Sequence, residues 1–409
     1  MTNKQAAIKV IRRLNRNGFQ ALMAGGCVRD MLLGKRPKDY DVATDAQPKE
    51  VIGLFKRTLK VGAKFGVVIV MLEGRQVEVA TFRTETGYAD GRHPSVVKFA
   101  NAAEDASRRD FTINGMFYDP VKDKVIDYVD GRADLKKGLI RTIGKPKERF
   151  GEDYLRMLRA VRFSTQLGFD IEPATWSEIC RNAKKITKIS GERIAIELEA
   201  ILVDPNRSVG AAMLAETGLA KAIFPGFSAR HAEFAVSVLA QLRKKVDFAL
   251  ALASLFAGCP TDFARQKHQI LKLSRSQNKH IKFLLANRGR LLDDRMPLSR
   301  LKMILAEPYF WNLYELQRAI QKATPDGAKG IAALGRLRKR IKDLGDVELR
   351  PKPLLSGHDL IRLGAVPGPA LGQLAEEMYI AQLEGKLKTL SQARQWAQKW
   401  LQKRRMTEK

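Results

Sequence analysis

The chain has 409 residues, of which 45% are hydrophobic, so it is long enough to build about two to four domains around buried cores. Its 73 Lys and Arg residues outnumber 44 Asp and Glu residues, and the formal net charge of +29 favours a polyanionic partner, with nucleic acid the first candidate. A generically basic surface would give the same charge, whereas no apolar run is long enough to predict a membrane-spanning segment.

The cysteines and the N-terminal residues indicate the compartment. Cys27, Cys180 and Cys259 are far apart and odd in number, which predicts neither a disulfide framework nor a zinc site and fits a reducing environment. Residues 1–15 alternate charged and apolar side chains and lack the apolar stretch of a signal peptide. We therefore expect a cytoplasmic protein.

Strand and helix patterns alternate through the first part of the chain. Apolar residues at helical spacing predict a helix over 5–18, and the apolar run Phe19–Met23 predicts a buried strand that ends at Gly25-Gly26. Further along we expect a helix over 28–33, a strand over 39–42, a helix over 48–55, and a hairpin of strands 67–72 and 76–82 that turns at Glu73-Gly74.

After Pro146 the character of the sequence changes, because apolar residues recur with a helical period and strand-like runs become rare. Helices are predicted at 151–167, 173–183, 191–202 and 207–217. The expected fold class is α+β: a small mixed-sheet head over 1–145, followed by a mainly α-helical neck (146–205), body (206–345) and tail (346–409).

The most informative local chemistry is the pair Gly25-Gly26, with Arg29 after it, followed by the acids Asp39 and Asp41. Residues two apart on a strand share a face, so the two carboxylates are predicted to project together and to repel each other unless a cation lies between them. Divalent ions such as Mg²⁺ serve this purpose in enzymes that transfer nucleotidyl groups, and a glycine turn before a helix can bring N–H groups to a triphosphate. An isolated Asp-x-Asp is more often a pair of surface acids, so the prediction depends on the combination.

These residues resemble a known family. The run GGCVRDMLLGKRPKDYDVAT (25–44) is similar to the first motif of class II tRNA nucleotidyltransferases and bacterial poly(A) polymerases. The resemblance continues through RRDFTINGM (108–116), DYVDGRADLKKGLIRTIG (127–144), RFGEDYLRMLRAVRF (149–163), SGERIAIELEAIL (190–202) and LAETGL (214–219). It implies a catalytic nucleotidyltransferase head, a neck that recognises the base, and a body and tail that bind RNA. It also implies Asp39 and Asp41 as catalytic, metal-binding residues.

The segment that begins at Glu152 suggests how bases are chosen. Asp153 and Arg156 are three residues apart and would be neighbours on a helix. A carboxylate accepts and a guanidinium donates, which matches the amino group and ring nitrogen shared by cytosine and adenine and mismatches uracil and guanine. The alternative is an intrahelical salt bridge on a solvated face. The resemblance favours base recognition and adds Arg159 and Arg162, which would orient Asp153 or reach phosphates.

Three further residues are candidates for the site. Arg109 and Asp110 match the family motif that contacts phosphate and ribose, the alternative being an ion pair at a helix start. Glu78 would be a third acid beside the metal or, equally, a cross-strand partner of Arg75 or Lys64.

Two features of the sequence indicate the branch of the family. Poly(A) polymerases of this group carry a basic residue where this chain has Ala63, and the loop from Arg83 to Val97 has ordinary length. We therefore expect an enzyme that adds CCA, or its terminal A, to tRNA from CTP and ATP. The alternatives are a poly(A) polymerase, an enzyme that adds only A, and a non-catalytic RNA-binding protein.

Overall fold

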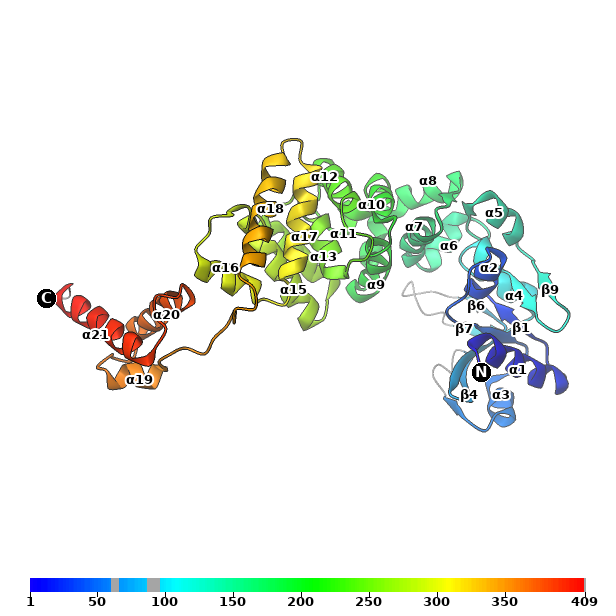
Figure 1. Cartoon of the computed structure of the whole chain (residues 1–409). Helices are drawn as coiled ribbons and strands as arrows, with labels where there is room; N and C mark the ends of the chain where they lie inside the picture. Colours follow the sequence, from blue (N-terminus) through cyan, green and yellow to red (C-terminus); the bar gives the residue numbers. More distant parts are fainter. Residues whose placement is uncertain (60–65, 87–95, 408–409) are drawn as a thin grey trace.

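The computed structural model describes residues 1–59, 66–86 and 96–407. The molecule is elongated: the mixed sheet lies at the N-terminal end, stacked helices follow, and a small helical unit lies at the other end beyond an extended segment (Figure 1). The expected class, a mixed-sheet head followed by a mainly helical remainder, is confirmed.

The head is built on a seven-stranded sheet of order β3-β4-β5-β2-β1-β8-β9. Strands β1 and β2 are antiparallel, β2 and β5 are parallel, and β4 and β5 form the predicted hairpin, whose turn residues Glu73 and Gly74 both have positive φ. The strands are β1 Ala21–Ala24, β2 Val42–Thr44, β3 Thr58–Leu59, β4 Val67–Leu72, β5 Arg75–Thr81, β8 Phe117–Asp119 and β9 Lys124–Ile126, with a separate hairpin of β6 Arg83–Thr86 and β7 Val96–Phe99.

Alternate side chains of β1 enter different clusters, because successive residues of a strand point to opposite faces. Ala21 and Met23 join the large core that helix α1 (Asn3–Arg16) covers, whereas Leu22 and Ala24 pack with Phe82 and Phe117 in a second cluster. The sheet is therefore buried on both faces at this strand. The other head helices are α2 Gly26–Leu32, α3 Pro48–Leu54, α4 Ala102–Ser107, the 3₁₀ turn η2 Thr112–Asn114, and α5 Gly131–Lys137.

The predicted helix over 151–167 is wrong in one respect, since it is interrupted. Helix α6 (Pro146–Glu152) ends before Asp153, whose backbone is extended (φ −151°, ψ 105°), and α7 (Leu155–Leu167) begins directly afterwards. A two-residue parallel pair, β10 (Leu139–Ile140) with β11 (Asp170–Ile171), was not predicted and ties the end of the head to the turn after α7.

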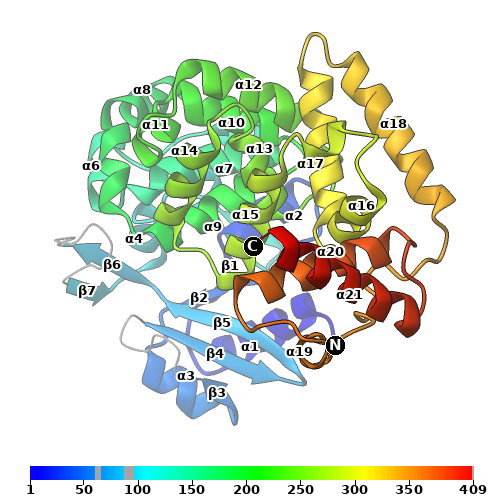
Figure 2. The same cartoon turned by 90° about the vertical axis from the view of Figure 1, so that its left-hand side faces the viewer.

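The remaining helices stack along the molecule (Figures 1 and 2). In chain order after α7 they are α8 Pro173–Asn182, η3 Ala183–Lys188, α9 Gly191–Leu202, α10 Arg207–Glu216, α11 Leu219–Ile223 and α12 Ala229–Ala240. They are followed by α13 Phe248–Leu255, α14 Thr261–Lys267, η4 His268–Leu271, α15 Arg275–Asn287, η5 Arg290–Leu292, α16 Leu298–Leu305, α17 Phe310–Ala323 and α18 Ala328–Asp343.

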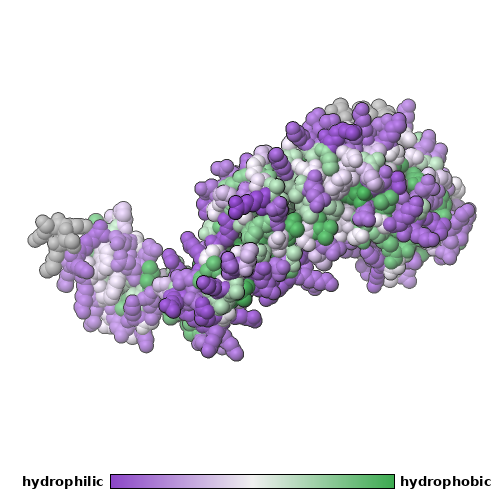
Figure 3. Space-filling model, turned by 90° about the horizontal axis from the view of Figure 1, so that it is seen from above, coloured by the Kyte–Doolittle hydropathy of each residue, from purple (hydrophilic) through white to green (hydrophobic). Residues whose placement is uncertain are grey.

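The C-terminal helices form a core of their own. Helices α19 (Gly357–Arg362), α20 (Pro369–Leu383) and α21 (Leu390–Thr407) enclose a cluster that includes Leu360, Leu374 and Met378 and is separate from the main core. The surface seen in Figure 3 is mostly hydrophilic with scattered hydrophobic spots. Among the described residues, no helix is both long and apolar enough to span a membrane.

Candidate active site

A cleft of about 550 Å³ lies between the sheet of the head and helices α7 and α9. Arginines dominate its wall, which suits an anionic ligand. The charged lining consists of Arg29, Asp41, Glu78, Arg83, Arg108, Arg109, Asp110, Asp153, Arg156, Arg159 and Arg193, and Gly25, Gly26, Asn114, Leu155 and Phe163 also line it. All the predicted nucleotide-binding residues except Arg162 line this cleft, as does Asp41, whereas Asp39 does not.

The glycine turn lies where β1 passes into α2. Gly25 has φ +75°, which favours glycine, and a Cβ built on it would come within 2.9 Å of Arg109 Nη1. The Arg109 guanidinium also donates to the Asn114 carbonyl at 3.2 Å and pairs with Asp105 at 3.0 Å. The absence of a side chain at Gly25 therefore lets a cationic group approach the backbone at the cleft.

The two predicted catalytic acids lie just before a strand and not on it. The prediction of a strand over 39–42 is wrong, because β2 begins at Val42, although the Asp41 carbonyl still accepts a hydrogen bond from the Ala24 N–H at 3.0 Å. Asp41 is exposed by surface area, yet protein atoms crowd its carboxylate. This crowding, together with the negative charges of Glu78 and Asp39, raises the pKa of Asp41 to about 6.

Glu78 lies beside Asp41. The parallel register pairs Val42 with Val79, so the residues before them, Asp41 and Glu78, are also neighbours, and both line the cleft. The alternative partners are not supported: Arg75 donates to the Met1 carbonyl at 3.0 Å, and Lys64 lies outside the described residues.

The crowded carboxylates suit a divalent cation. A bound cation would offset the repulsion that raises the pKa of Asp41, and carboxylate oxygens are the ligands that hard ions prefer. In the described part of the chain no group of three or more His, Cys, Asp or Glu side chains is arranged to hold an ion by itself. Magnesium sites commonly use only one or two carboxylates, completed by water and substrate phosphates.

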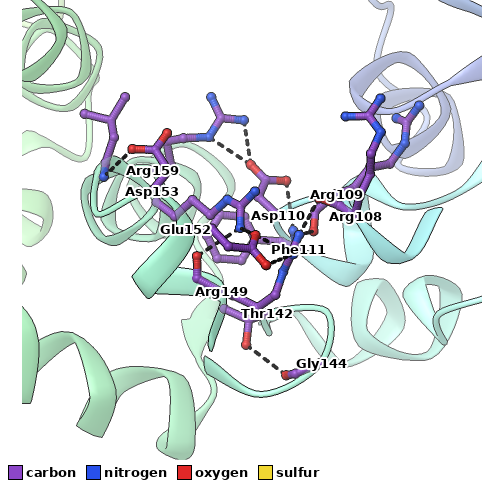
Figure 4. Close-up of polar contacts among 12 residues, drawn as sticks. Arg108, Arg109, Asp110, Phe111, Thr142, Gly144, Arg149, Glu152, Asp153 and Arg159 are labelled. Carbon is purple, nitrogen blue, oxygen red and sulfur yellow. Dashed lines mark hydrogen bonds and ion pairs between the residues drawn. The ribbon is translucent and has the colours of Figure 1, made fainter. Parts of the chain in front are cut away.

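Asp110 is engaged by protein groups. Its carboxylate accepts hydrogen bonds from Arg159 Nε at 2.8 Å and Nη2 at 2.5 Å (Figure 4). It also accepts a hydrogen bond from Asn114 Nδ2 at 3.2 Å. Burial alone would raise the pKa of Asp110, but the charge and hydrogen bonds of Arg159 outweigh it, so the pKa lies well below its usual range. Asp110 therefore fixes an arginine of the cleft, and a ribose contact stays a prediction.

Asp153 and Arg156 do not form the predicted pair with each other. Asp153 pairs with Arg193 at 2.6 Å, whereas Arg156 pairs with Glu152 at 2.5 Å. The extended backbone at Asp153 explains the difference, since side chains three residues apart are neighbours only within one helix. Both side chains nevertheless line the cleft.

Arg149 connects the helical part to the head. It is buried and pairs with Glu152, and its guanidinium donates to the backbone carbonyls of Arg108 and Arg109 (Figure 4). Helix α6 is thereby attached to the backbone segment that precedes Asp110. The two walls of the cleft are thereby held together.

Phe163 supports three of the arginines. The guanidiniums of Arg29, Arg159 and Arg162 lie 5.2, 5.3 and 4.3 Å from the centre of its buried ring. Arg162 also pairs with the buried Glu197 at 2.9 Å, which places it behind the cleft wall. Arg162 and Glu197 therefore stiffen the cleft from behind.

The sequence interpretation missed Asn114, Phe163 and Arg193 as residues of the cleft. Arg193 was within a motif quoted for the family resemblance, but nothing in the local sequence indicates that it meets a residue 40 positions earlier. Ala63 and most of the loop from Arg83 to Val97, which the branch prediction used, lie outside the described residues.

A mixed sheet whose central strands bring carboxylates to an arginine-lined cleft defines a nucleotidyltransferase head. Two family models agree: the one described as "Poly A polymerase head domain" matches residues 21–141, and "Probable RNA and SrmB-binding site of polymerase A" matches residues 168–230.

Similar proteins narrow the family further. The chain is 35% identical over 387 residues to the CCA-adding enzyme of Lactobacillus johnsonii, with 93% of each chain covered. It is 36% identical over 407 residues to that of Lacticaseibacillus paracasei, with 94% of each covered. The chain belongs to the family of CCA-adding enzymes, and the predicted family resemblance is confirmed.

Solved structures agree with this assignment. The chain superposes on the Bacillus stearothermophilus CCA-adding enzyme in complex with CTP with a TM-score of 0.81 at 29% identity, over 100% of both chains. The Thermotoga maritima CCA-adding enzyme complexed with tRNA gives a TM-score of 0.67 at 22% identity, with 97% and 95% covered, and shows the shared fold alone.

Proposed function

We propose that this chain adds C and A residues to the 3′ end of tRNA from CTP and ATP, without a nucleic-acid template, and releases pyrophosphate. The observation that carries the proposal is one cleft in which Asp41 and Glu78 of the head face Asp153 and Arg156 of the helical part. Such a cleft can hold a triphosphate at one side and read a base at the other. The CCA-adding family of the chain supports the same reaction.

The reacting atoms meet at the carboxylates. The 3′-hydroxyl of the RNA loses its proton to water, its oxygen forms a bond to the α-phosphorus, the bond from that phosphorus to the bridging oxygen breaks, and pyrophosphate leaves. Asp39 and Asp41 would hold Mg²⁺, with Glu78 beside them; when bound, such an ion polarises the α-phosphate and balances the charge of the leaving group. Asp39 lies close enough to Asp41 to raise its pKa, which supports a shared role.

The arginines balance the charge of the triphosphate. Arg29 and Arg109 lie beside the glycine turn, and each is fixed by a protein acid or amide: Arg29 donates to Asn114 Oδ1 at 2.7 Å, and Arg109 pairs with Asp105. Fixed guanidiniums need no rearrangement as charge moves to the pyrophosphate, and that preorganisation lowers the barrier. Asp110 contributes by holding Arg159 at the cleft.

Base choice follows from hydrogen-bond direction. The Asp153 carboxylate only accepts and the Arg156 guanidinium only donates, so together they match the amino group and ring nitrogen of cytosine or adenine. Uracil and guanine present the reverse order and would leave charged groups unpaired, which can lower their use by several orders of magnitude, roughly 10⁴-fold.

The rest of the molecule would hold the RNA. We assign catalysis to the head (1–145), base recognition to the neck (146–205) and tRNA binding to the body (206–345) and tail (346–409), in line with the +29 charge. A reaction on tRNA in this family also supports a cytoplasmic location.

One assay tests the proposal. A tRNA that lacks its 3′ end is incubated with the protein, Mg²⁺, and CTP, ATP or both, and the products are sequenced. Two C residues and one A, followed by a stop, support the proposal. Growth by A alone on tRNA that ends in CC would indicate an A-adding enzyme, and long A tails on unrelated RNA would indicate a poly(A) polymerase.

A further inference from the structure

Two opposite charges in the cleft, Asp153 and Arg156, stay apart. In the described part of the chain no ion pair joins them, although they are three residues apart in sequence. Asp153 is held by Arg193 and Arg156 by Glu152. Because an Asp and an Arg that paired with each other would no longer be available to a base, something must keep them separate.

We propose that Arg193 is a positioning residue that sets base specificity by holding Asp153 away from Arg156. This inference rests on the proposed reading of bases by Asp153. Arg193 would not contact the base itself; it would fix where, and in which direction, Asp153 accepts a hydrogen bond.

The contact between Arg193 and Asp153 is bidentate. Arg193 Nη2 lies 2.6 Å from Asp153 Oδ2 and donates there, and Nη1 donates to Oδ1 at 3.3 Å. The Leu155 N–H donates to Oδ1 as well, at 3.0 Å. A carboxylate accepts about four hydrogen bonds, so these three contacts fill Oδ1 and leave one position on Oδ2. One free acceptor in a fixed direction is what the amino group of cytosine or adenine requires.

Arg193 is itself firmly placed. It is in the first turn of α9, two residues after Gly191, where a Cβ would lie 1.9 Å from the Ile270 carbonyl oxygen, so the helix start packs tightly on the backbone of η4. Its side chain is 21% exposed and lines the cleft, and that of Asp153 is 16% exposed. The pair is thus partly enclosed, where a charge-assisted contact is stronger than at an open surface.

The same helix face fixes a second arginine of the neck. Glu197 lies one turn after Arg193 and pairs with Arg162 at 2.9 Å. Helix α9 therefore provides a cation, Arg193, for Asp153 and an anion, Glu197, for Arg162 of α7. The other two arginines of α7 that were predicted to bind the nucleotide also pair with acids outside that helix. Loss of Arg193 would free Asp153 to turn toward Arg156, and both groups that distinguish bases would then be lost together.

The test compares Arg193→Met, Arg193→Lys, Asp153→Ala and wild-type protein on tRNA ending in CC and on tRNA lacking all of CCA. For each, kcat/KM is measured with ATP and GTP, and with CTP and UTP. Arg193→Met should lower the preference for ATP over GTP and for CTP over UTP by about tenfold or more, because the acceptor is no longer fixed. Arg193→Lys should recover part of the preference, since it keeps the positive charge but cannot donate two parallel hydrogen bonds to the carboxylate.

A matched control is Arg181→Met, which removes an arginine paired with Glu178 on α8, away from the cleft lining. It should leave both nucleotide preferences unchanged. The tRNA dissociation constant and the thermal midpoint of Arg193→Met are measured in parallel, because a merely structural ion pair would change the midpoint and would lower the use of all four nucleotides equally.

The outcomes separate the two claims. An unchanged preference in Arg193→Met, with a clear loss of preference in Asp153→Ala, would overturn the role of Arg193 alone. An unchanged preference in Asp153→Ala would overturn the base-reading part of the proposed function.

Discussion

The ion pair between Asp110 and Arg159 joins the head to helix α7, and its removal should lower the stability measurably. Asp110 is 9% exposed and accepts two hydrogen bonds from Arg159, so Asp110→Asn keeps the shape of the side chain but leaves the guanidinium without its main counter-charge. Breaking a buried charged pair costs about 3–5 kcal/mol. Because the Arg159 side chain is 33% exposed and has Glu197 at 3.8 Å, we expect the lower end, about 3 kcal/mol.

The assay is urea unfolding followed by circular dichroism. A loss of about 3 kcal/mol should lower the midpoint of the transition by about 1 M at a urea slope of about 3 kcal/mol/M. Glu73→Gln, which removes an exposed pair with Lys9, is the matched control and should leave the midpoint unchanged.

The stabilisation that Asp110 provides should also depend on pH, in a direction that its lowered pKa determines. The pKa of Asp110 is lower in the folded protein than in the unfolded chain, where it is about 3.9, so its contribution is complete above that value and is lost as the pH falls below it. The difference between wild type and Asp110→Asn should be constant from about pH 7 to pH 5 and shrink below about pH 4. Equal midpoints at pH 7, or a difference that does not shrink in acid, would refute this account of the pair.

Further predictions concern the glycines, the metal and the tail. Gly25→Ala should cost roughly 1–2 kcal/mol from its positive φ and also displace Arg109, so kcat/KM for ATP should fall while tRNA binding, measured by filter retention, stays the same. Gly191→Ala should lower the thermal midpoint, by an amount equivalent to about 1–3 kcal/mol, since its Cβ would overlap the Ile270 carbonyl. Dialysis against EDTA should abolish nucleotide addition and Mg²⁺ should restore it; full activity in EDTA would contradict the metal role. Deletion of the chain from residue 346 onward should weaken tRNA binding and leave ATP binding, measured by calorimetry, unchanged, because the tail has its own core.

Much of the fold could be predicted from the sequence because periodic patterns mark regular elements. The hairpin turn was predicted at Glu73-Gly74, where both residues have positive φ. The helices predicted over 173–183 and 191–202 agree with α8 and α9 to within one residue. The strand expected over 39–42 was placed too early, since Asp39 and Asp41 differ little in local pattern from strand residues and only the pairing of Val42 with β1 and β5 defines the start.

Interactions between distant residues could not be predicted. The break at Asp153 accompanies a contact with Arg193, 40 residues later, and Arg159 meets Asp110 across 49 residues. Periodicity carries no information about which charged side chains meet after folding. The sequence therefore indicated most of the charged residues of the cleft but not how they are paired.

The central claim is that Asp41 takes part in nucleotide transfer at this cleft, and a single-turnover experiment tests it most directly. Radiolabelled ATP and tRNA ending in CC are mixed with wild-type protein or with Asp41→Asn in the presence of Mg²⁺. The variant should add A at least about a thousandfold more slowly than the wild type, while it binds the tRNA with the same dissociation constant. Addition of A by Asp41→Asn at the wild-type rate would contradict the claim.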